Sequence, residues 1–158
     1  MKRRVAVLAV MFLALAAVNV VLAQAQTNPF AGTWKLDVAK STFKPGPAPK
    51  SEMRMWKSSG RVSVTGFHAN GKPISYGYIM QPDGKQHATF GAIPNGANGV
   101  FSQRTNANTI VAKFIRHGKQ IETTTFTVSQ DGKMMTMTAI GTAPSGTAFD
   151  DVAIWEKQ

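Results

Sequence analysis

The stretch 109–141, TIVAKFIRHGKQIETTTFTVSQDGKMMTMTAIG, shows how this chain is organised. Three runs rich in β-branched or other apolar residues are separated by two glycine turns, His117-Gly118-Lys119 and Asp131-Gly132-Lys133. Glycine takes the positive φ that a tight hairpin turn requires, and Asn or Asp before it tolerates the same conformation. The stretch therefore predicts three sequential antiparallel strands, near 109–116, 119–129 and 133–141.

The same pattern continues in both directions along the chain. It predicts further strands near 32–37, 51–57, 61–67, 73–80, 86–90, 99–105 and 147–157. A sheet of about ten strands joined in sequence avoids exposed edges most simply by closing on itself. The expected fold class is all-β: an antiparallel up-and-down meander of about ten strands closed into a lipocalin-like barrel.

Hairpin connections alternate between the two ends of such a barrel. The turns at 58–60, 82–85, 106–108 and 130–132 are expected at one end, and 38–50, 69–72, 91–98, 117–119 and 142–146 at the other. All three long connections therefore fall at a single mouth, where the Pro-rich segment 39–50 either covers the opening with Phe43 inward or lies in solvent. Trp34, Trp56 and Trp155 are expected near the narrow end, either as a plug or as separate buried or surface residues.

Residues 1–25 have the pattern of a secretory signal peptide. Lys2, Arg3 and Arg4 precede an apolar run, and Ala23-Gln24-Ala25 supplies the small-x-small cleavage site. An uncleaved membrane anchor is the alternative, because the apolar run is nearly long enough to span a bilayer. We expect one domain over 26–158, a periplasmic or secreted location, and no stable membrane insertion after cleavage.

The composition of 26–158 agrees with this interpretation. The segment loses three of the 18 basic residues and none of the 8 acidic ones, which leaves a net charge of +7. Leu36 is its only leucine, whereas Thr, Ile and Val are frequent, which favours strands over helices. The chain has no cysteine, so disulfides, zinc fingers and thiol chemistry are excluded. Five of its basic residues follow turn glycines at both ends of the barrel and three lie on the long loop, a distribution that does not predict a nucleic-acid partner.

Several short motifs carry a family resemblance. Gly32-Thr33-Trp34 resembles the G-x-W opening of lipocalin-like (calycin) barrels. Over nearly the whole of 26–158 the chain is also similar to a group of secreted bacterial lipocalin-like proteins without an established activity, through pieces such as 32–37, 39–41, 45–47, 70–73, 129–133 and 155–158. The resemblance implies a barrel that holds a small apolar ligand. The Arg that often covers the lipocalin Trp cannot be placed, and the second lipocalin motif is not visible.

Alternation along the strands suggests which side chains point inward. The candidate ligand-binding residues are six from the strands and three lysines from the long loop, which would meet an acidic headgroup: Val62, Val64, Tyr76, Tyr78, Phe114, Met137, Lys40, Lys44 and Lys50. Tyr hydroxyls would supply polar anchors in an apolar pocket. The alternative is a filled core without a cavity.

Other chemistry is poorly supported. The pairs Met53-x-Met55 and Met135-x-Met137 fit pocket lining better than a Cu(I) site, and no metal or other cofactor is expected. His68 and His117 both fall at the mouth and could converge there, although solvated loop histidines are the simpler interpretation. Asp150 and Asp151 alternate across a strand, the other acids are isolated in sequence, and no known catalytic motif occurs, so the sequence does not favour an enzyme.

Two functional hypotheses remain. The first is a periplasmic or secreted lipocalin-like protein that binds a small apolar or amphipathic molecule non-covalently. The second is an envelope structural or interaction protein with a filled core and no ligand. A mouth-histidine enzyme is a weaker third.

Overall fold

A computed structural model describes residues 28–158, so the expected signal peptide lies outside the described residues. Eleven strands and one 3₁₀ turn make up the described part of the chain. The strands are β1 (Gly32–Thr42), β2 (Ser51–Trp56), β3 (Arg61–Phe67), β4 (Pro73–Ile79), β5 (Asp83–His87), β6 (Thr89–Gly91), β7 (Gly99–Asn106), β8 (Thr109–Arg116), β9 (Lys119–Val128), β10 (Met134–Thr142) and β11 (Ala148–Lys157). The 3₁₀ turn η1 (Pro94–Gly96) lies between β6 and β7.

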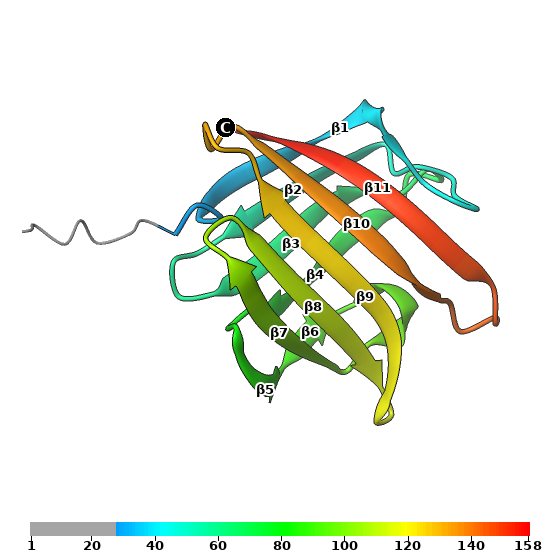
Figure 1. The fold of residues 1–158 in the computed structure, drawn as a ribbon. Coiled ribbons are helices and arrows are strands. Elements are labelled where there is room, and N and C mark those ends of the chain that lie inside the picture. Colours follow the sequence, from blue (N-terminus) through cyan, green and yellow to red (C-terminus); the bar gives the residue numbers. More distant parts are fainter. Residues whose placement is uncertain (1–27) are drawn as a thin grey trace, which may run out of the picture.

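The strands form one antiparallel sheet that curls into a nearly closed barrel (Figure 1). Their order is β5-β7-β8-β9-β10-β11-β1-β2-β3-β4-β6, so the first and last strands of the chain pair with each other and close the meander. The two edge strands, β5 and β6, are consecutive in sequence. The predicted fold class is confirmed, with eleven strands in place of about ten.

The additional strand comes from the segment predicted as one strand over 86–90. Its first half pairs with β7 as β5, and its second half pairs with β4 as β6, so the chain crosses the seam of the barrel at Ala88. The amide of Ile79 donates to the Ala88 carbonyl oxygen over 3.0 Å. Asp83-Gly84-Lys85, expected as a hairpin turn, instead lies within β5, where Gly84 takes a φ of +73° at a break in register.

Strand β1 is also longer than expected. It continues through Thr42, with a bulge in its pairing to β11 between Asp37 and Thr42. Lys40 therefore belongs to a strand, and the connection to β2 begins after Thr42 rather than at residue 38.

The narrow end of the barrel is filled by aromatic side chains. Phe30, from the segment before β1, lies 5.0 Å from the Trp56 ring centre, and Trp56 meets Phe126 edge-on at 5.4 Å. The Trp34 indole N–H donates to the Phe30 carbonyl oxygen over 2.8 Å, and the Lys157 ammonium lies 5.0 Å from the Trp34 ring centre. Two of the three tryptophans thus pack against Phe30 at this end.

Candidate functional site

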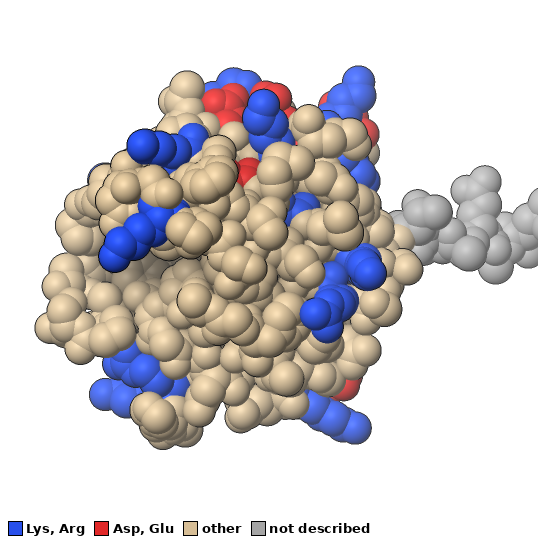
Figure 2. Space-filling model, turned by 180° about the vertical axis from the view of Figure 1, so that it is seen from behind, with Lys and Arg blue, Asp and Glu red and all other residues tan. Residues whose placement is uncertain are grey.

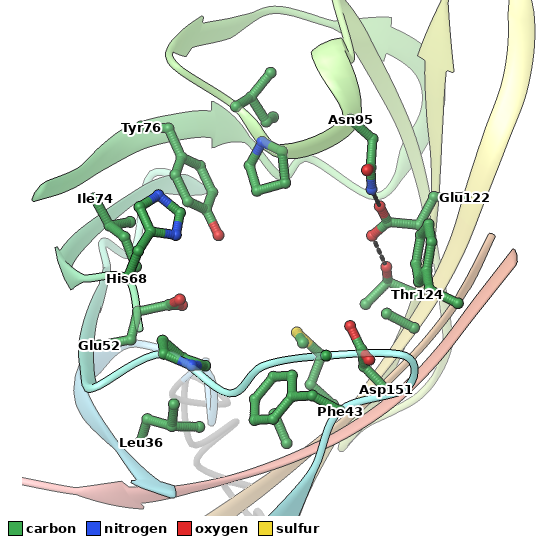
Figure 3. A pocket seen from close by; sticks show the side chains of 18 of the residues that line it. Leu36, Phe43, Glu52, His68, Ile74, Tyr76, Asn95, Glu122, Thr124 and Asp151 are labelled. Carbon is green, nitrogen blue, oxygen red and sulfur yellow. Dashed lines mark hydrogen bonds between the residues drawn. The ribbon is translucent and has the colours of Figure 1, made fainter. Parts of the chain in front are cut away.

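A cavity of about 660 Å³ occupies the other end of the barrel interior. Its rim is formed by the β1–β2 connection (Phe43 to Pro49), the β3–β4 turn, the connection containing η1, and the start of the β10–β11 turn. The rear view in Figure 2 shows a hollow on this face, with Lys or Arg side chains near its edge. The prediction that the long connections share one mouth is confirmed, and Phe43 points into the cavity (Figure 3).

Most of the cavity wall is apolar. The apolar lining includes side chains from β1, β4, β8, β9, β10 and β11: Leu36, Ile74, Phe114, Phe126, Met137, Ala139, Ala153 and Trp155. Trp155 lines the cavity, so of the two alternatives that the sequence left open it is a separate buried residue and not part of a plug at the narrow end. Its side chain is buried.

A buried arginine lies on one side of this cavity. Arg54 on β2 is 2% exposed, and its guanidinium lies 4.6 Å from the Trp155 ring centre and 5.4 Å from that of Phe126. One terminal nitrogen donates to the Glu52 carboxylate over 3.2 Å, and the other donates to the Tyr78 hydroxyl. Burial raises the pKa of Glu52, and the Arg54 guanidinium opposes that rise. Both terminal nitrogens of Arg54 are thus hydrogen-bonded within the chain, whereas its buried Nε–H has no partner among the described residues.

Two tyrosines of β4 stand on the same side. Their rings stack with centres 6.5 Å apart, and the Tyr76 hydroxyl points into the cavity (Figure 3). Burial raises the pKa of Tyr78 to about 12 and the pKa of Tyr76 well above its usual value. Both phenols are therefore neutral hydrogen-bonding groups at physiological pH.

The opposite side carries two carboxyl groups. Glu122 on β9 accepts hydrogen bonds from the Thr124 hydroxyl (2.6 Å) and the Asn95 amide (3.4 Å). Asp151 on β11 accepts the backbone N–H of Lys44 over 2.9 Å. Burial raises the pKa of both carboxyls, and the hydrogen bonds from Thr124 and Asn95 oppose the rise at Glu122. Figure 3 shows Glu122, Thr124 and Asp151 facing Glu52 and Tyr76 across the cavity.

The register of the strands explains why these side chains converge. Thr124, Ala139 and Asp151 are directly opposite one another on β9, β10 and β11, so their side chains share one face of the sheet. Glu122 is two residues before Thr124 and has the same orientation. Glu52 and Arg54 share the inward face of β2 with Trp56.

Five of the nine predicted ligand-binding residues line the cavity: Tyr76, Tyr78, Phe114, Met137 and Lys44. Val62 and Val64 are fully buried in the core, but the cavity does not reach them. Lys50 lies in the connection before β2, outside the cavity lining. The inward orientation that alternation gave for the strand residues is confirmed, although none of this tests ligand binding.

Lys40 does not belong to the site. Its ammonium lies 2.9 Å from both Asp37 and Glu156, in a strand, so it cannot form a loop cluster with Lys44 and Lys50. The expected position of this lysine was wrong because the bulge extends β1 by five residues beyond the predicted end at residue 37.

The two mouth histidines are not brought together in the cavity. His68 is exposed and lines its rim, whereas His117 occupies the β8–β9 turn and is not part of the lining. Asp150 and Asp151 point to opposite faces, as alternation indicated, with Asp151 inward. Two of the acids that were treated as isolated in sequence, Glu52 and Glu122, line the same cavity as Asp151, so for these two the expectation was wrong.

The charged groups of the interior were missed because alternation in β2 is misleading. In Ser51–Trp56 the apolar Met53 and Met55 suggest an inward face, yet Met55 is 49% exposed and the inward residues are Glu52, Arg54 and Trp56. The residue that identifies the inward face is Trp56, the largest side chain of the strand. Arg54 is two residues before Trp56 and therefore points to the same face. The two methionine pairs cannot form one shared copper site, because Met55 faces out of the barrel and Met135 faces into it.

No group of three or more His, Asp or Glu side chains placed to hold a metal ion occurs within residues 28–158. Over the same residues, no helix has the length and apolar character needed to span a membrane.

Comparison with protein-family models gives no match, and comparison with curated protein sequences gives none either. Among solved structures, a similar chain is the zebrafish ileal bile acid-binding protein complexed with cholic acid. It is 12% identical, with a TM-score of 0.45 over 82% of this chain and 99% of that chain. A likeness at this level does not indicate what this chain binds.

Proposed function

We propose that this chain binds a small apolar or amphipathic molecule non-covalently inside the barrel, and that it does so in the periplasm or outside the cell after residues 1–25 are removed. The observation that carries the proposal is the cavity of about 660 Å³. Its volume falls within the roughly 300–1,000 Å³ typical of small-molecule sites, and its apolar wall with a few convergent polar groups has the usual composition of such a site.

The barrel provides a rigid container for such a ligand. The cavity is bounded by strands hydrogen-bonded to their neighbours around nearly the whole circumference, while the rim consists of loops. The filled core required by the alternative structural hypothesis is not present in residues 28–158, because the cavity occupies the mouth half of the interior. The signal-peptide pattern of 1–25 supports the extracytoplasmic location.

Titration with N-phenyl-1-naphthylamine, an uncharged dye that fluoresces in apolar surroundings, tests the binding site. We expect saturable fluorescence with the parent protein, and its loss in Ala139→Trp, because Ala139 is 4% exposed and lies between Thr124 and Asp151 on the cavity wall. Ile140→Trp is the matched control, since its side chain is 57% exposed on the outer face of the same strand. If Ala139→Trp does not fold, Ala139→Leu serves the same purpose with a smaller volume.

Equal dye binding by the Ala139 and Ile140 variants would contradict an interior site. The location is tested separately, by the intact mass of protein from a periplasmic extract, which should correspond to a chain that begins at Gln26. A cytoplasmic chain that retains Met1 would contradict it.

A further inference from the structure

Apart from the exposed lysines of its rim, the cavity has three carboxyl groups and one cation. Glu52, Glu122 and Asp151 line it, while the cations of its lining are Arg54, Lys44 and Lys72. The two lysines are exposed residues of the rim. Arg54 is buried, and its terminal nitrogens donate to Glu52 and Tyr78, while its Nε–H has no hydrogen-bond partner among the described residues. Because Glu52 balances the charge of Arg54, Glu122 and Asp151 leave the interior with an excess of acidic groups.

Glu122 is the interior acid without a basic partner. Both of its oxygens accept hydrogen bonds, and both donors, Thr124 and Asn95, are neutral. Asp151 on the same wall is likewise held by a backbone N–H. A desolvated carboxylate is strongly stabilised by an adjacent positive charge that also donates hydrogen bonds. The chain supplies such a charge to Glu52 and does not supply one to Glu122.

A second observation shows that the polar interior is incomplete without a ligand. The Trp155 side chain is 1% exposed and lines the same cavity, and its indole N–H has no hydrogen-bond partner among the described residues. The Tyr76 hydroxyl points into the cavity from the opposite side (Figure 3). Buried polar groups are nearly always paired, so this unpaired donor indicates a site completed by a bound molecule that carries a hydrogen-bond acceptor. That acceptor is a group other than an ammonium, which can only donate.

Resting on the function proposed above, we propose that the ligand is an amphipathic organic cation, a protonated amine on an apolar body, whose ammonium group binds between Glu122 and Asp151 while its apolar part packs against Trp155, Phe126 and Phe114. The absence of a metal-ligating cluster in residues 28–158 favours an organic cation over a metal ion. The anionic headgroup expected from the rim lysines is thus replaced by a cationic one bound deeper in the cavity.

Three molecules with the same alkyl chain test the charge preference: decylamine, decanoate and decanol, each below its micellar concentration at pH 7.5. They compete with N-phenyl-1-naphthylamine for the purified protein. We expect half-displacement by decylamine at a concentration about tenfold lower than by decanoate, because one charge-assisted contact contributes on the order of a factor of ten. Equal or stronger displacement by decanoate overturns the proposal.

Substitutions of single residues test which carboxyl groups bind the ammonium group of the ligand. Glu122→Gln and Asp151→Asn should each weaken the binding of decylamine by about five- to tenfold and leave the binding of decanol unchanged. Asp150→Asn is the matched control, since Asp150 points out of the barrel beside Asp151. Unchanged decylamine binding in both interior variants overturns the proposal, and circular dichroism shows whether they are folded.

The two proposals fail in different ways. Binding of the dye and decanol without a preference for decylamine overturns the cationic ligand and leaves the carrier function intact. If the dye does not bind, decylamine is titrated directly by calorimetry, and the absence of saturable heat overturns both.

Discussion

Two glutamates on opposite walls of one cavity differ in what the chain provides for them. Glu52 shares the inward face of β2 with Arg54, which forms an ion pair with it at 3.2 Å. Glu122 on β9 is also largely buried, but its hydrogen-bond donors are the neutral Thr124 and Asn95. Burial raises the pKa of both groups; the charge of Arg54 opposes the rise at both, but Arg54 donates a hydrogen bond only to Glu52.

The two glutamates therefore have different roles: Glu52 belongs to an ion pair within the chain, whereas Glu122 is available to bind a cation. Arg54 and Glu52 form a buried ion pair beside aromatic rings, so breaking the pair would leave a buried charge. Glu122 carries a desolvation cost that its neutral donors offset only in part, and a bound cation would offset the remainder. The following experiments test whether the two sides of the cavity really behave in these different ways.

Removing the guanidinium should have the largest effect. Arg54→Met leaves the Glu52 carboxyl buried without its cation, and we expect the free energy of unfolding to fall by about 3–5 kcal/mol. Urea denaturation measures the loss. Arg61→Met, at an exposed arginine whose guanidinium lies 4.1 Å from the Phe90 ring centre, should cost about 1 kcal/mol or less.

The double variant Arg54→Met with Glu52→Gln should recover much of the stability, because no buried charge is then left unpaired. A loss below about 1 kcal/mol for Arg54→Met alone would show that the two walls do not differ in this respect.

The sequence predicts the fold better than it predicts this contrast. Glycine turns and β-branched runs are local signals, so they predict the meander, and counting hairpins then places every long connection at one end. The extension of β1 and the division of 83–91 between two partners depend on long-range pairing across β11 and across the seam, which no local pattern records.

The site residues show the same limit. Tyr76, Tyr78, Phe114 and Met137 follow from alternation, because apolar side chains of a strand usually face inward. The inward orientation of Arg54 and Glu122 does not follow from alternation, because a charged residue in a strand normally faces solvent. Only the complete barrel shows which hydrogen bonds and aromatic rings surround these two side chains. Interior polar groups at a binding site are where pattern reasoning is expected to fail.

On the Glu122 side, the strongest neutral contact can be removed without changing volume. Thr124→Val deletes the hydroxyl that donates to Glu122 over 2.6 Å in a residue 1% exposed. A hydrogen bond to a charged group contributes about 1.5–3 kcal/mol, so we expect a loss of roughly 1.5 kcal/mol at neutral pH in thermal or urea unfolding. Thr125→Val, on the outer face of the same strand, is the control and should change little. A loss equal to that of Arg54→Met would mean that Thr124 is as essential to its glutamate as Arg54 is to Glu52.

The smallest expected effect has the opposite sign. Glu122→Gln keeps the shape of the side chain and removes a buried charge that has no basic partner, so we expect the free energy of unfolding to rise by on the order of 1 kcal/mol at pH 7.5. The matched change Glu52→Gln should instead destabilise, because it leaves Arg54 buried without its carboxylate.

The pH dependence of the Glu122→Gln gain follows from the direction of the pKa shift. The pKa of Glu122 is higher in the folded than in the unfolded chain, so the folded state binds its proton more tightly. The stability that this proton confers is complete below the unfolded pKa and is lost as the pH rises through the folded pKa. Glutamine resembles the protonated form and retains that stability. The difference between Glu122→Gln and the parent protein should therefore shrink as urea denaturation is repeated toward pH 4, with Arg54 and Asp151 as the nearby charges that modulate it. A gain that stays constant with pH would mean that Glu122 does not titrate as a desolvated carboxyl, and the contrast with Glu52 would then rest on geometry alone.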